Sequence, residues 1–351
     1  MEKNHISHFT ANTVAKLFGT MPDGKEVHSY TLTNGKGLEV SFATYGAVIT
    51  SLLVTGKDGK QTDVVLGFDN LEGYIASYGV PSPPYFGAVI GRYAGRIANG
   101  RFSIDGKQFQ LNKNLGENTL HGGPIGFCRV VWNVKEVKQE AESASITFVY
   151  ISPDGDEHFP GELVTEVKYT LTADNEVKIE YTAKSSEDTV INLTQHSYFN
   201  LDGHKGNVLS QQLTVNSPAI LEITQDGIPT GKYIKAADKG IDFTSSADCP
   251  ESIDNSFALT DAASPAAILV SKNTGLKMTV FTDQPSVHIY VGGNCFDIVK
   301  GKEGAAYHKH SGICFETQNY PDAPNHPNFP SAVLHKGDTY TQATTWKFEL
   351  I

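Results

Sequence analysis

The chain has 351 residues, of which 39% are hydrophobic and 19% are charged, a composition that supports a large core and excludes extensive disorder. Its 39 acidic and 28 basic residues give a formal net charge of −11, which argues against nucleic acids and anionic membranes as partners, because both require basic patches. No apolar run approaches the ~20 residues of a membrane-spanning helix.

Strand-like stretches follow one another along the chain. Residues 37–54 are rich in the β-branched and aromatic residues that favour strands. Residues 163–172 and 176–184 flank the turn sequence ADN, and apolar residues recur at every second position in both, at Val167, Tyr169, Leu171, Val177, Ile179 and Tyr181. This period-two alternation predicts an antiparallel hairpin. The same pattern continues at residues 144–151, 276–283 and 286–293.

Helical periodicity is scarce, and we expect only a short helix within residues 69–77. No fixed-period repeat, low-complexity tract or linker divides the chain. We expect residues 1–25 to form a loosely packed N-terminal arm and residues 26–351 to form one domain. Many strands with few helices predict an all-β fold, built as a large antiparallel sandwich or barrel.

The cysteines and the N-terminus bear on the cellular compartment. No two of Cys128, Cys249, Cys295 and Cys314 lie at C-x-x-C spacing, so the sequence supports neither a zinc site nor a redox motif. Free buried thiols are typical of a reducing compartment. The N-terminal residues lack the apolar segment of a signal peptide. We therefore expect a cytoplasmic protein; a periplasmic or secreted one would require a signal peptide that had been removed.

Four stretches place polar residues in apolar surroundings: residues 87–102, 118–132, 194–201 and 311–331. In the first, arginines punctuate a run of small and apolar residues. Arg96 and Arg101 are explained either as exposed side chains or, at a cleft, as planar donors to hydroxyl and carboxylate oxygens.

The other three stretches carry candidate acid–base groups. His121 precedes two glycines, which allow the backbone to approach a ligand closely; capping of its own loop is the alternative. His196 lies beside Gln195, Ser197 and other polar residues, where local hydrogen bonding would also explain it. Glu316 interrupts an apolar strand pattern, where a carboxylate is costly unless it is paired or functional. A histidine and a glutamate in one cleft form a usable acid–base pair.

Several kinds of chemistry lose support because their motifs are missing. The sequence has no G-x-S-x-G elbow, no H-E-x-x-H helix, no P-loop and no dinucleotide-binding fingerprint. Acyl transfer, zinc proteolysis, phosphoryl transfer and hydride transfer are therefore not indicated.

Taken together, the motifs of this chain resemble those of the aldose 1-epimerase (galactose mutarotase) family. The resemblance rests on GRYAGRI, NTLHGG, SPDGDEHFPG, NLTQHSYFNL, IDNSF and HSGICFETQNYPDAPNHPNFPS, which occur in the family's order between residues 91 and 331. It implies a single mutarotase-like β-sandwich, or supersandwich, with few short helices and a sugar cleft. It also implies interconversion of the α and β anomers of a free aldohexose such as galactose or glucose, without a metal or organic cofactor, by a monomer or homodimer.

The resemblance also assigns roles to particular residues. By motif, His196 is the general acid, Glu316 is the general base, and His121 assists on the side of the ring oxygen. Ring opening needs one proton removed from the C1 hydroxyl and one delivered to the ring oxygen, and a carboxylate and a histidine suit these tasks near neutral pH.

The resemblance also assigns substrate-binding residues, and this chain departs from the family at two positions near them. By the same carry-over, Arg96 and Asp254 hold sugar hydroxyls, and Tyr198 lies beside the general acid as a wall or orienting group. His288 is placed in the substrate site where some members of the family have a glutamine. Gly95 is a second departure, because many members have asparagine there. Both departures concern hydroxyl specificity and not the acid–base pair.

Two alternatives remain open from the sequence. A sugar-phosphate 1-epimerase, acting for example on a hexose 6-phosphate, would need an additional basic cluster for the phosphate. A non-catalytic sugar-binding module would tolerate loss of His196 or Glu316, and both are present. Faster relaxation of a freshly dissolved sugar in a polarimeter distinguishes catalysis from binding alone.

Overall fold

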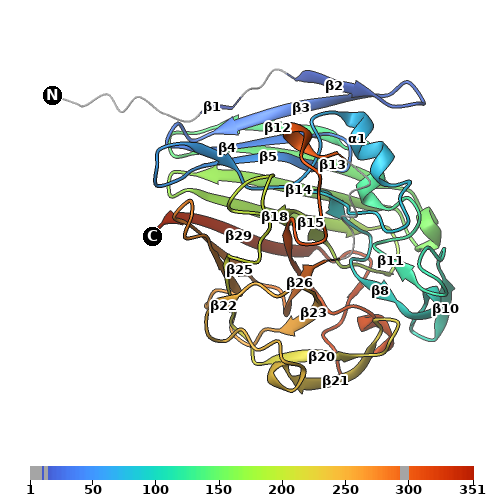
Figure 1. The fold of residues 1–351 in the computed structure, drawn as a ribbon. Helices are drawn as coiled ribbons and strands as arrows, with labels where there is room; N and C mark the ends of the chain where they lie inside the picture. Colours follow the sequence, from blue (N-terminus) through green and yellow to red (C-terminus); the bar gives the residue numbers. More distant parts are fainter. Residues whose placement is uncertain (1–9, 12–14, 293–299) are drawn as a thin grey trace.

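The protein is described here from a computed structural model that covers residues 10–11, 15–292 and 300–351. Its largest sheet is antiparallel, and its long central strands cross the middle of the molecule (Figure 1). In spatial order, the nine described strands of this sheet are β12 (Asn133–Gln139), β13 (Ser143–Ser152), β14 (Leu163–Thr172), β15 (Glu176–Ser185), β29 (Tyr340–Leu350), β25 (Leu276–Thr282), β24 (Ala267–Val270), β19 (Gln212–Val215) and β22 (Ala247–Asp248).

Two six-stranded antiparallel sheets, again counted over the described residues, accompany it. One comprises β1 (Thr10–Ala11), β2 (Lys16–Thr20), β3 (Glu26–Thr33), β4 (Leu38–Ala43), β5 (Val48–Thr55) and β6 (Gln61–Asp63), with β1 and β2 both paired to β3. The other comprises, in spatial order, β18 (Tyr198–Phe199), β27 (Ile313–Gln318), β26 (Ser286–Val291), β23 (Ile253–Ala258), β20 (Ala219–Ile223) and β21 (Pro229–Lys235).

Short paired strands and one α-helix complete the described part. The strand pairs are β7 (Val89–Ile90) with β17 (Thr194–Gln195), β8 (Arg96–Ile97) with β11 (Thr119–Leu120), β9 (Arg101–Ile104) with β10 (Lys107–Gln110), and β16 (Thr189–Val190) with β28 (Val333–Leu334). Helix α1 spans Leu71–Ser77. Short 3-10 turns lie at Ala98–Gly100, Phe127–Arg129, Asp156–His158, Ala236–Lys239, Lys302–Gly304 and Ala323–Asn325.

The core lies between the nine-stranded sheet and the two smaller sheets. Phe42 on β4 packs on Tyr169 of β14, with ring centroids 4.8 Å apart. Near the other six-stranded sheet, Phe199 on β18 packs on Trp346 of β29, also at 4.8 Å. Residues of all three sheets belong to one continuous buried cluster. Burial of each large apolar side chain contributes about 1.5–3 kcal/mol, so this shared core fixes how the sheets lie against one another.

The alternating pattern seen in the sequence determines the register of the central hairpin. Along β15, Val177, Ile179 and Tyr181 are buried, while the intervening Lys178 and Glu180 are exposed. The apolar positions of β14 and β15 lie directly opposite one another, as Val167↔Tyr181, Tyr169↔Ile179 and Leu171↔Val177. The predicted hairpin and the all-β sandwich are therefore confirmed.

The short helix and the N-terminal residues can be compared with their predictions. Helix α1 begins at Leu71, and the Asn70 side chain accepts a hydrogen bond from the Gly73 N–H at its N-terminus. Part of the predicted arm, residues 1–9 and 12–14, lies outside the described residues. The described remainder includes β2, whose pairing with β3 makes it a strand of the sheet. None of the helices in the described ranges is long and apolar enough to span a membrane.

The unbroken core generates a prediction about domain organisation. Because the three sheets share one buried cluster, we expect residues 26–351 to behave as one cooperative unit. Limited proteolysis should trim exposed loops or termini without releasing two stable halves. Mass spectrometry of the resistant products measures this, and two separately folded fragments would contradict it.

Candidate active site

The cleft is built on one face of β23, β26 and β27, because successive side chains of a strand point to opposite sides. On β26, Val287 and Ile289 enter the buried core, while His288 and Tyr290 line a cavity on the other side. On β27, Phe315 enters the core, and Glu316 lines the cavity. The same pleat therefore assigns apolar residues to the core and polar residues to the cleft.

The register of the strands places functional side chains in a row. Ser256 on β23 lies opposite His288 on β26, and His288 lies opposite Glu316 on β27. Directly opposite residues on adjacent antiparallel strands have Cβ atoms only ~4.5–5.5 Å apart. Three side chains that span 60 residues of sequence, from Ser256 to Glu316, thus lie next to one another in one site.

The opposite wall of the cleft comes from the β8–β11 pair. Arg96 on β8 lies opposite Leu120 on β11, directly before His121. The Asn114 side chain fixes this segment, since it accepts a hydrogen bond from the Leu120 N–H at 2.7 Å and donates one to the Leu120 carbonyl at 2.9 Å. Gly122, at φ 86°, allows close backbone packing, because a Cβ there would lie 2.0 Å from the Gly91 carbonyl oxygen.

His196 lies between β17 and β18, and its backbone is held on both sides. Its N–H donates to the Ala88 carbonyl at 2.9 Å, and its carbonyl accepts from the Gly87 N–H at 2.9 Å. The His196 Nε2 atom lies 3.5 Å from Oε1 of Glu316, and each of these side chains is about 4% exposed. A histidine and a carboxylate therefore face each other in a buried part of the cleft.

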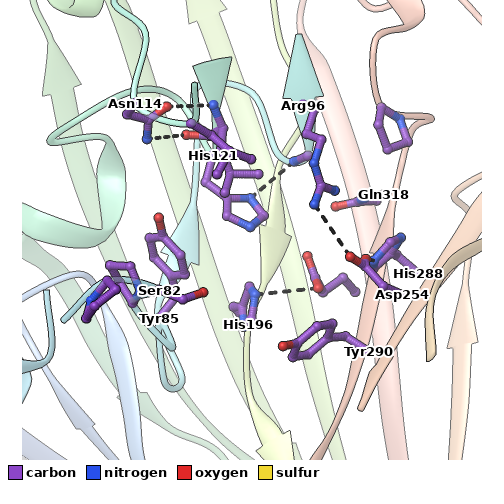
Figure 2. A pocket seen from close by; sticks show the side chains of 17 residues that line it. Ser82, Tyr85, Arg96, Asn114, His121, His196, Asp254, His288, Tyr290 and Gln318 are labelled. Atoms are coloured by element: carbon purple, nitrogen blue, oxygen red, sulfur yellow. Dashed lines mark hydrogen bonds and ion pairs between the residues drawn. The ribbon is translucent and has the colours of Figure 1, made fainter. Parts of the chain in front are cut away.

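The cleft has a volume of about 310 Å³, at the small end of the ~300–1,000 Å³ typical of small-molecule sites. Figure 2 shows its polar side chains converging from both walls. Its lining residues are Pro81, Ser82, Pro83, Tyr85, Gly95, Arg96, Asn114, Leu115, Leu120, His121, His196, Asp254, His288, Tyr290, Glu316, Gln318 and Pro321. A small substrate rich in hydroxyl groups matches this combination of size and polarity.

His121 is held as a neutral hydrogen-bond donor. Its Nδ1 accepts a hydrogen bond from the Gly95 N–H at 3.2 Å, so its remaining proton resides on Nε2. Burial lowers the pKa of His121 well below its ordinary value, and electrostatic interactions with the neighbouring His196 and Arg96 lower it further. At neutral pH this side chain therefore offers one N–H donor without carrying a charge.

His288, in contrast to the neutral His121, is held as a positively charged imidazolium. Its Nδ1 contacts the Ser256 hydroxyl at 2.9 Å, and its Nε2 contacts Oδ1 of Asp254 at 2.8 Å. Burial disfavours the imidazolium, but the hydrogen bond and charge of Asp254 outweigh burial and raise the pKa of His288. Burial would likewise raise the pKa of Asp254, but His288 and Arg96 together hold it well below its usual range. The pair is therefore ionic, although solvent screens the half-exposed Asp254.

Three buried polar atoms in the cleft wall lack a hydrogen-bond partner among the described protein groups. They are Oε2 of Glu316, Oε1 of Gln318 and Nε of Arg96. A buried donor or acceptor left without a partner costs ~1–3 kcal/mol, so such atoms mark positions where a ligand restores a lost interaction. Two acceptors and one donor suit the hydroxyl groups of a sugar, since each hydroxyl can both donate and accept.

The carboxylate of Glu316 and the rings of His121 and His196 lie close enough to reach one metal ion, with candidate ligand atoms within 4.8 Å of one another. The hydrogen bonding of His121 disagrees with that role. A metal-ligating histidine normally donates its second ring N–H to an acceptor, whereas Nδ1 of His121 meets a donor, the Gly95 N–H. The cluster is therefore better suited to proton transfer than to metal binding.

The structure brings together all but one of the residues selected from the sequence. The residues that line the same cleft are His196, Glu316, His121, Arg96, Asp254 and His288. Tyr198, which the sequence analysis placed beside the general acid as a wall or orienting group, is 1% exposed and lies outside the cleft lining. Its ring centroid is 5.4 Å from that of His196, so it packs against the histidine.

Several residues of the cleft escaped the sequence analysis. Gln318 and Tyr290 could have been found, because each lies two residues beyond a selected residue on the same strand face, after Glu316 and His288 respectively. Ser82 and Tyr85 belong to the loop between α1 and β7, and no periodicity predicts where such a loop packs.

The first arginine of GRYAGR has a structural role. Arg92 is buried and donates hydrogen bonds to the hydroxyl and carbonyl oxygens of Ser152 and to the carbonyl oxygens of Pro153, Pro160 and Gly161. Burial lowers its pKa to about 10, so it remains charged at neutral pH. It thus anchors the turn after β13 to the segment between β7 and β8, which leads to Arg96.

These observations point to a class of protein: an all-β sandwich with a buried histidine–carboxylate pair in a small polar cleft suits acid–base chemistry on small polyhydroxyl substrates. The comparisons agree. The family described as aldose 1-epimerase matches residues 28–347. Galactose mutarotase of Bos taurus is 38% identical, covering 95% of this chain and 98% of its own length. Aldose 1-epimerase of Escherichia coli K12 is 33% identical, covering 93% and 96%.

A solved structure extends the similarity to the fold. The crystal structure of galactose 1-epimerase from Lactobacillus acidophilus NCFM superposes with a TM-score of 0.83 at 26% identity, covering 97% of this chain and 99% of that one. The chain belongs to the aldose 1-epimerase family. The predictions of the family, the fold and an isomerase that interconverts sugar anomers are confirmed.

We expect the enzyme to retain full activity after exhaustive treatment with a chelator. The Gly95–His121 hydrogen bond disfavours metal ligation, and proton transfer between a carboxylate, a histidine and a sugar needs no Lewis acid. Polarimetry before and after EDTA treatment, with the metal content measured in the same samples, provides the check. Loss of activity that a divalent ion restores would show this expectation to be wrong.

We expect sugar binding to weaken at alkaline pH as His288 loses its charge. Because the pKa of His288 is raised, its ion pair with Asp254 is fully present below about pH 6.5 and is lost as the pH rises through the raised value. In that pH range KM should therefore rise and the melting temperature should fall. In His288→Gln, KM should depend less on pH than in the wild type. Polarimetric KM values and melting temperatures between pH 6 and 9 measure this.

A matched control is the exposed His335, whose pKa is likewise raised by a carboxylate, that of Asp188. His335→Gln should leave the pH dependence of KM as in the wild type, since His335 lies outside the cleft lining. An unchanged KM profile in His288→Gln would contradict the assignment.

Proposed function

We propose that the protein opens and recloses the ring of a free aldose, with Glu316 as the general base and His196 as the general acid. The observation that carries this proposal is the buried pair itself. Nε2 of His196 and Oε1 of Glu316 are 3.5 Å apart, and the second oxygen of Glu316 has no described protein partner. A candidate proton donor and a candidate proton acceptor thus lie side by side, where both can reach the same small part of a bound sugar.

The proposed steps conserve every proton. Glu316 takes the proton of the C1 hydroxyl while His196 gives a proton to the ring oxygen, and the bond between C1 and the ring oxygen breaks. The aldehyde rotates about the C1–C2 bond and presents its other face. In ring closure, neutral His196 recovers the proton from the attacking hydroxyl, and Glu316 returns its proton to the carbonyl oxygen, which yields the other anomer.

The surrounding residues are proposed to hold the sugar. The neutral His121 offers an N–H donor and can stabilise the charge that develops on the ring oxygen. Arg96 Nε and Gln318 Oε1, both without a described protein partner, would bond to ring hydroxyls. Asp254, held as an anion, would accept a further hydroxyl proton in a hydrogen bond.

A free aldose fits the cleft better than a sugar phosphate. Among the described residues that line it, Arg96 is the sole arginine or lysine, and it already contacts Asp254 at 3.5 Å. A phosphate normally engages several charge-assisted donors. The neutral His121 adds no positive charge to the site.

We propose that the protein resides in a reducing compartment such as the cytoplasm, and the state of its cysteines supports this. Cys128 and Cys249 are buried free thiols, which is the usual state of cysteines in such compartments, and Cys314 is likewise buried. Cys295 lies outside the described residues. Localisation of the full-length protein by fractionation would test this.

We expect Glu316→Gln and His196→Asn each to fold, to bind sugar and to lose at least ~100-fold in kcat, because a positioned acid or base contributes about 10²–10⁴-fold. The two losses should not add in the double variant, since ring opening needs both proton transfers. Polarimetry on fresh α-D-glucose and α-D-galactose measures kcat.

Glu180→Gln, on the exposed side of β15, provides the matched control and should turn over like the wild type. A Glu316→Gln enzyme with near-normal mutarotation would end the proposal. A wild-type protein that binds sugar without accelerating anomer exchange would instead favour a binding module.

A further inference from the structure

The two ring nitrogens of His196 face different partners. Nε2 points toward the cleft and Oε1 of Glu316 at 3.5 Å, as Figure 2 shows by the dashed line from His196. Nδ1 points away from the cleft and lies 3.8 Å from Sγ of Cys314. The nitrogen that would exchange a proton with the sugar is thus Nε2, and the thiol contacts the nitrogen on the opposite edge of the ring.

Cys314 is fixed relative to both catalytic groups. It lies on β27 two residues before Glu316 and is 0% exposed. The strand register sets it opposite Tyr198 on β18 and opposite Tyr290 on β26. Because a cysteine side chain is short, the backbone of β27 holds its sulfur in place as firmly as it holds Glu316.

We propose that Cys314 is a positioning residue that controls the protonation of His196. The inference rests on the acid role of His196 proposed above. To serve as an acid, His196 must carry protons on both nitrogens, and the Nδ1 proton then needs an acceptor. Sulfur is a weak acceptor and the thiol a weak donor, so Cys314 can serve the charged and the neutral ring in turn without strongly favouring either.

The other two histidines of the cleft show what different partners would do. A carboxylate on the ring of His288 holds it charged, and a backbone N–H on Nδ1 of His121 holds it neutral. Neither could readily change its protonation during a catalytic cycle. His196 alone among these three contacts a thiol through Nδ1, the partner least committed to one state.

Among the described residues, two of the rings near His196 carry no charge at neutral pH. The rings of Tyr85, His121 and Tyr198 lie 5.6, 5.4 and 5.4 Å from its ring, measured between centroids. Burial raises the pKa of Tyr85, so its hydroxyl is uncharged at neutral pH, and His121 is neutral as well. The carboxyl group of Glu316 faces Nε2 of His196 rather than Nδ1.

The test compares Cys314→Ser with Cys314→Ala. A hydroxyl is a better acceptor than a thiol and should favour the imidazolium, whereas alanine leaves the Nδ1 proton without its partner. We expect the pKa of His196 to rise in the first variant by roughly 0.4–1 pH unit, the size of one ordinary hydrogen bond, and to fall by a smaller amount in the second, because sulfur is only a weak acceptor. The alkaline limb of kcat should move in the same directions.

Two measurements on the full-length enzyme separate this role from simple packing. NMR titration of the isotope-labelled His196 ring reads its protonation in the resting enzyme, independently of turnover. Polarimetry from pH 5 to 9 gives the kcat profile. Cys249→Ala is the matched control, since it removes another buried thiol that lies outside the cleft lining, and it should leave both readouts unchanged.

Opposite shifts of the His196 titration in the two variants would support the proposal. It would be overturned if both variants titrate like the wild type, or if they lose activity equally at every pH with an unshifted profile, as expected of a purely structural cysteine. Failure of the acid role itself would appear separately, as near-normal turnover in His196→Asn.

Discussion

The pleat of β23, β26 and β27 is the constraint on which the core and the cleft both depend. The side chains of Val287, Ile289 and Phe315 anchor one face of these strands in the shared core. Because side chains alternate along a strand, the intervening side chains must point into the cleft. A shift of one residue along β27 would exchange Glu316 with an apolar neighbour. Hydrophobic packing therefore supplies the precision with which the acid–base groups are placed.

Within that frame, three histidines of the cleft differ in the group that one ring nitrogen of each contacts. A backbone N–H, a carboxylate and a thiol face His121, His288 and His196 respectively. The backbone N–H leaves His121 neutral at a pH at which the carboxylate of Asp254 keeps His288 charged. Such differences between neighbouring titratable groups are how a fold assigns separate roles in proton transfer.

Much of this arrangement could be predicted from the sequence, and the exceptions have physical causes. Alternation revealed the hairpin, and a carboxylate in an apolar strand singled out Glu316. The position of Tyr198 beside His196 was expected, but its exclusion from the cleft lining was not, because residues 196–197 lie between two strands and no regular alternation sets the side that Tyr198 faces. The contact of Cys314 with His196 depends on how β18 and β27 pair across more than 100 residues, which no local pattern encodes.

The depth of the His196–Glu316 pair has a consequence for exchange with solvent. Both side chains are about 4% exposed, and under the proposed roles ring closure returns each proton to the group that released it. One complete interconversion then leaves the cleft in its starting state without drawing protons from bulk water. Turnover under these conditions is indifferent to the concentration of buffer, in contrast to the spontaneous reaction in water, where buffer species act as the acid and the base.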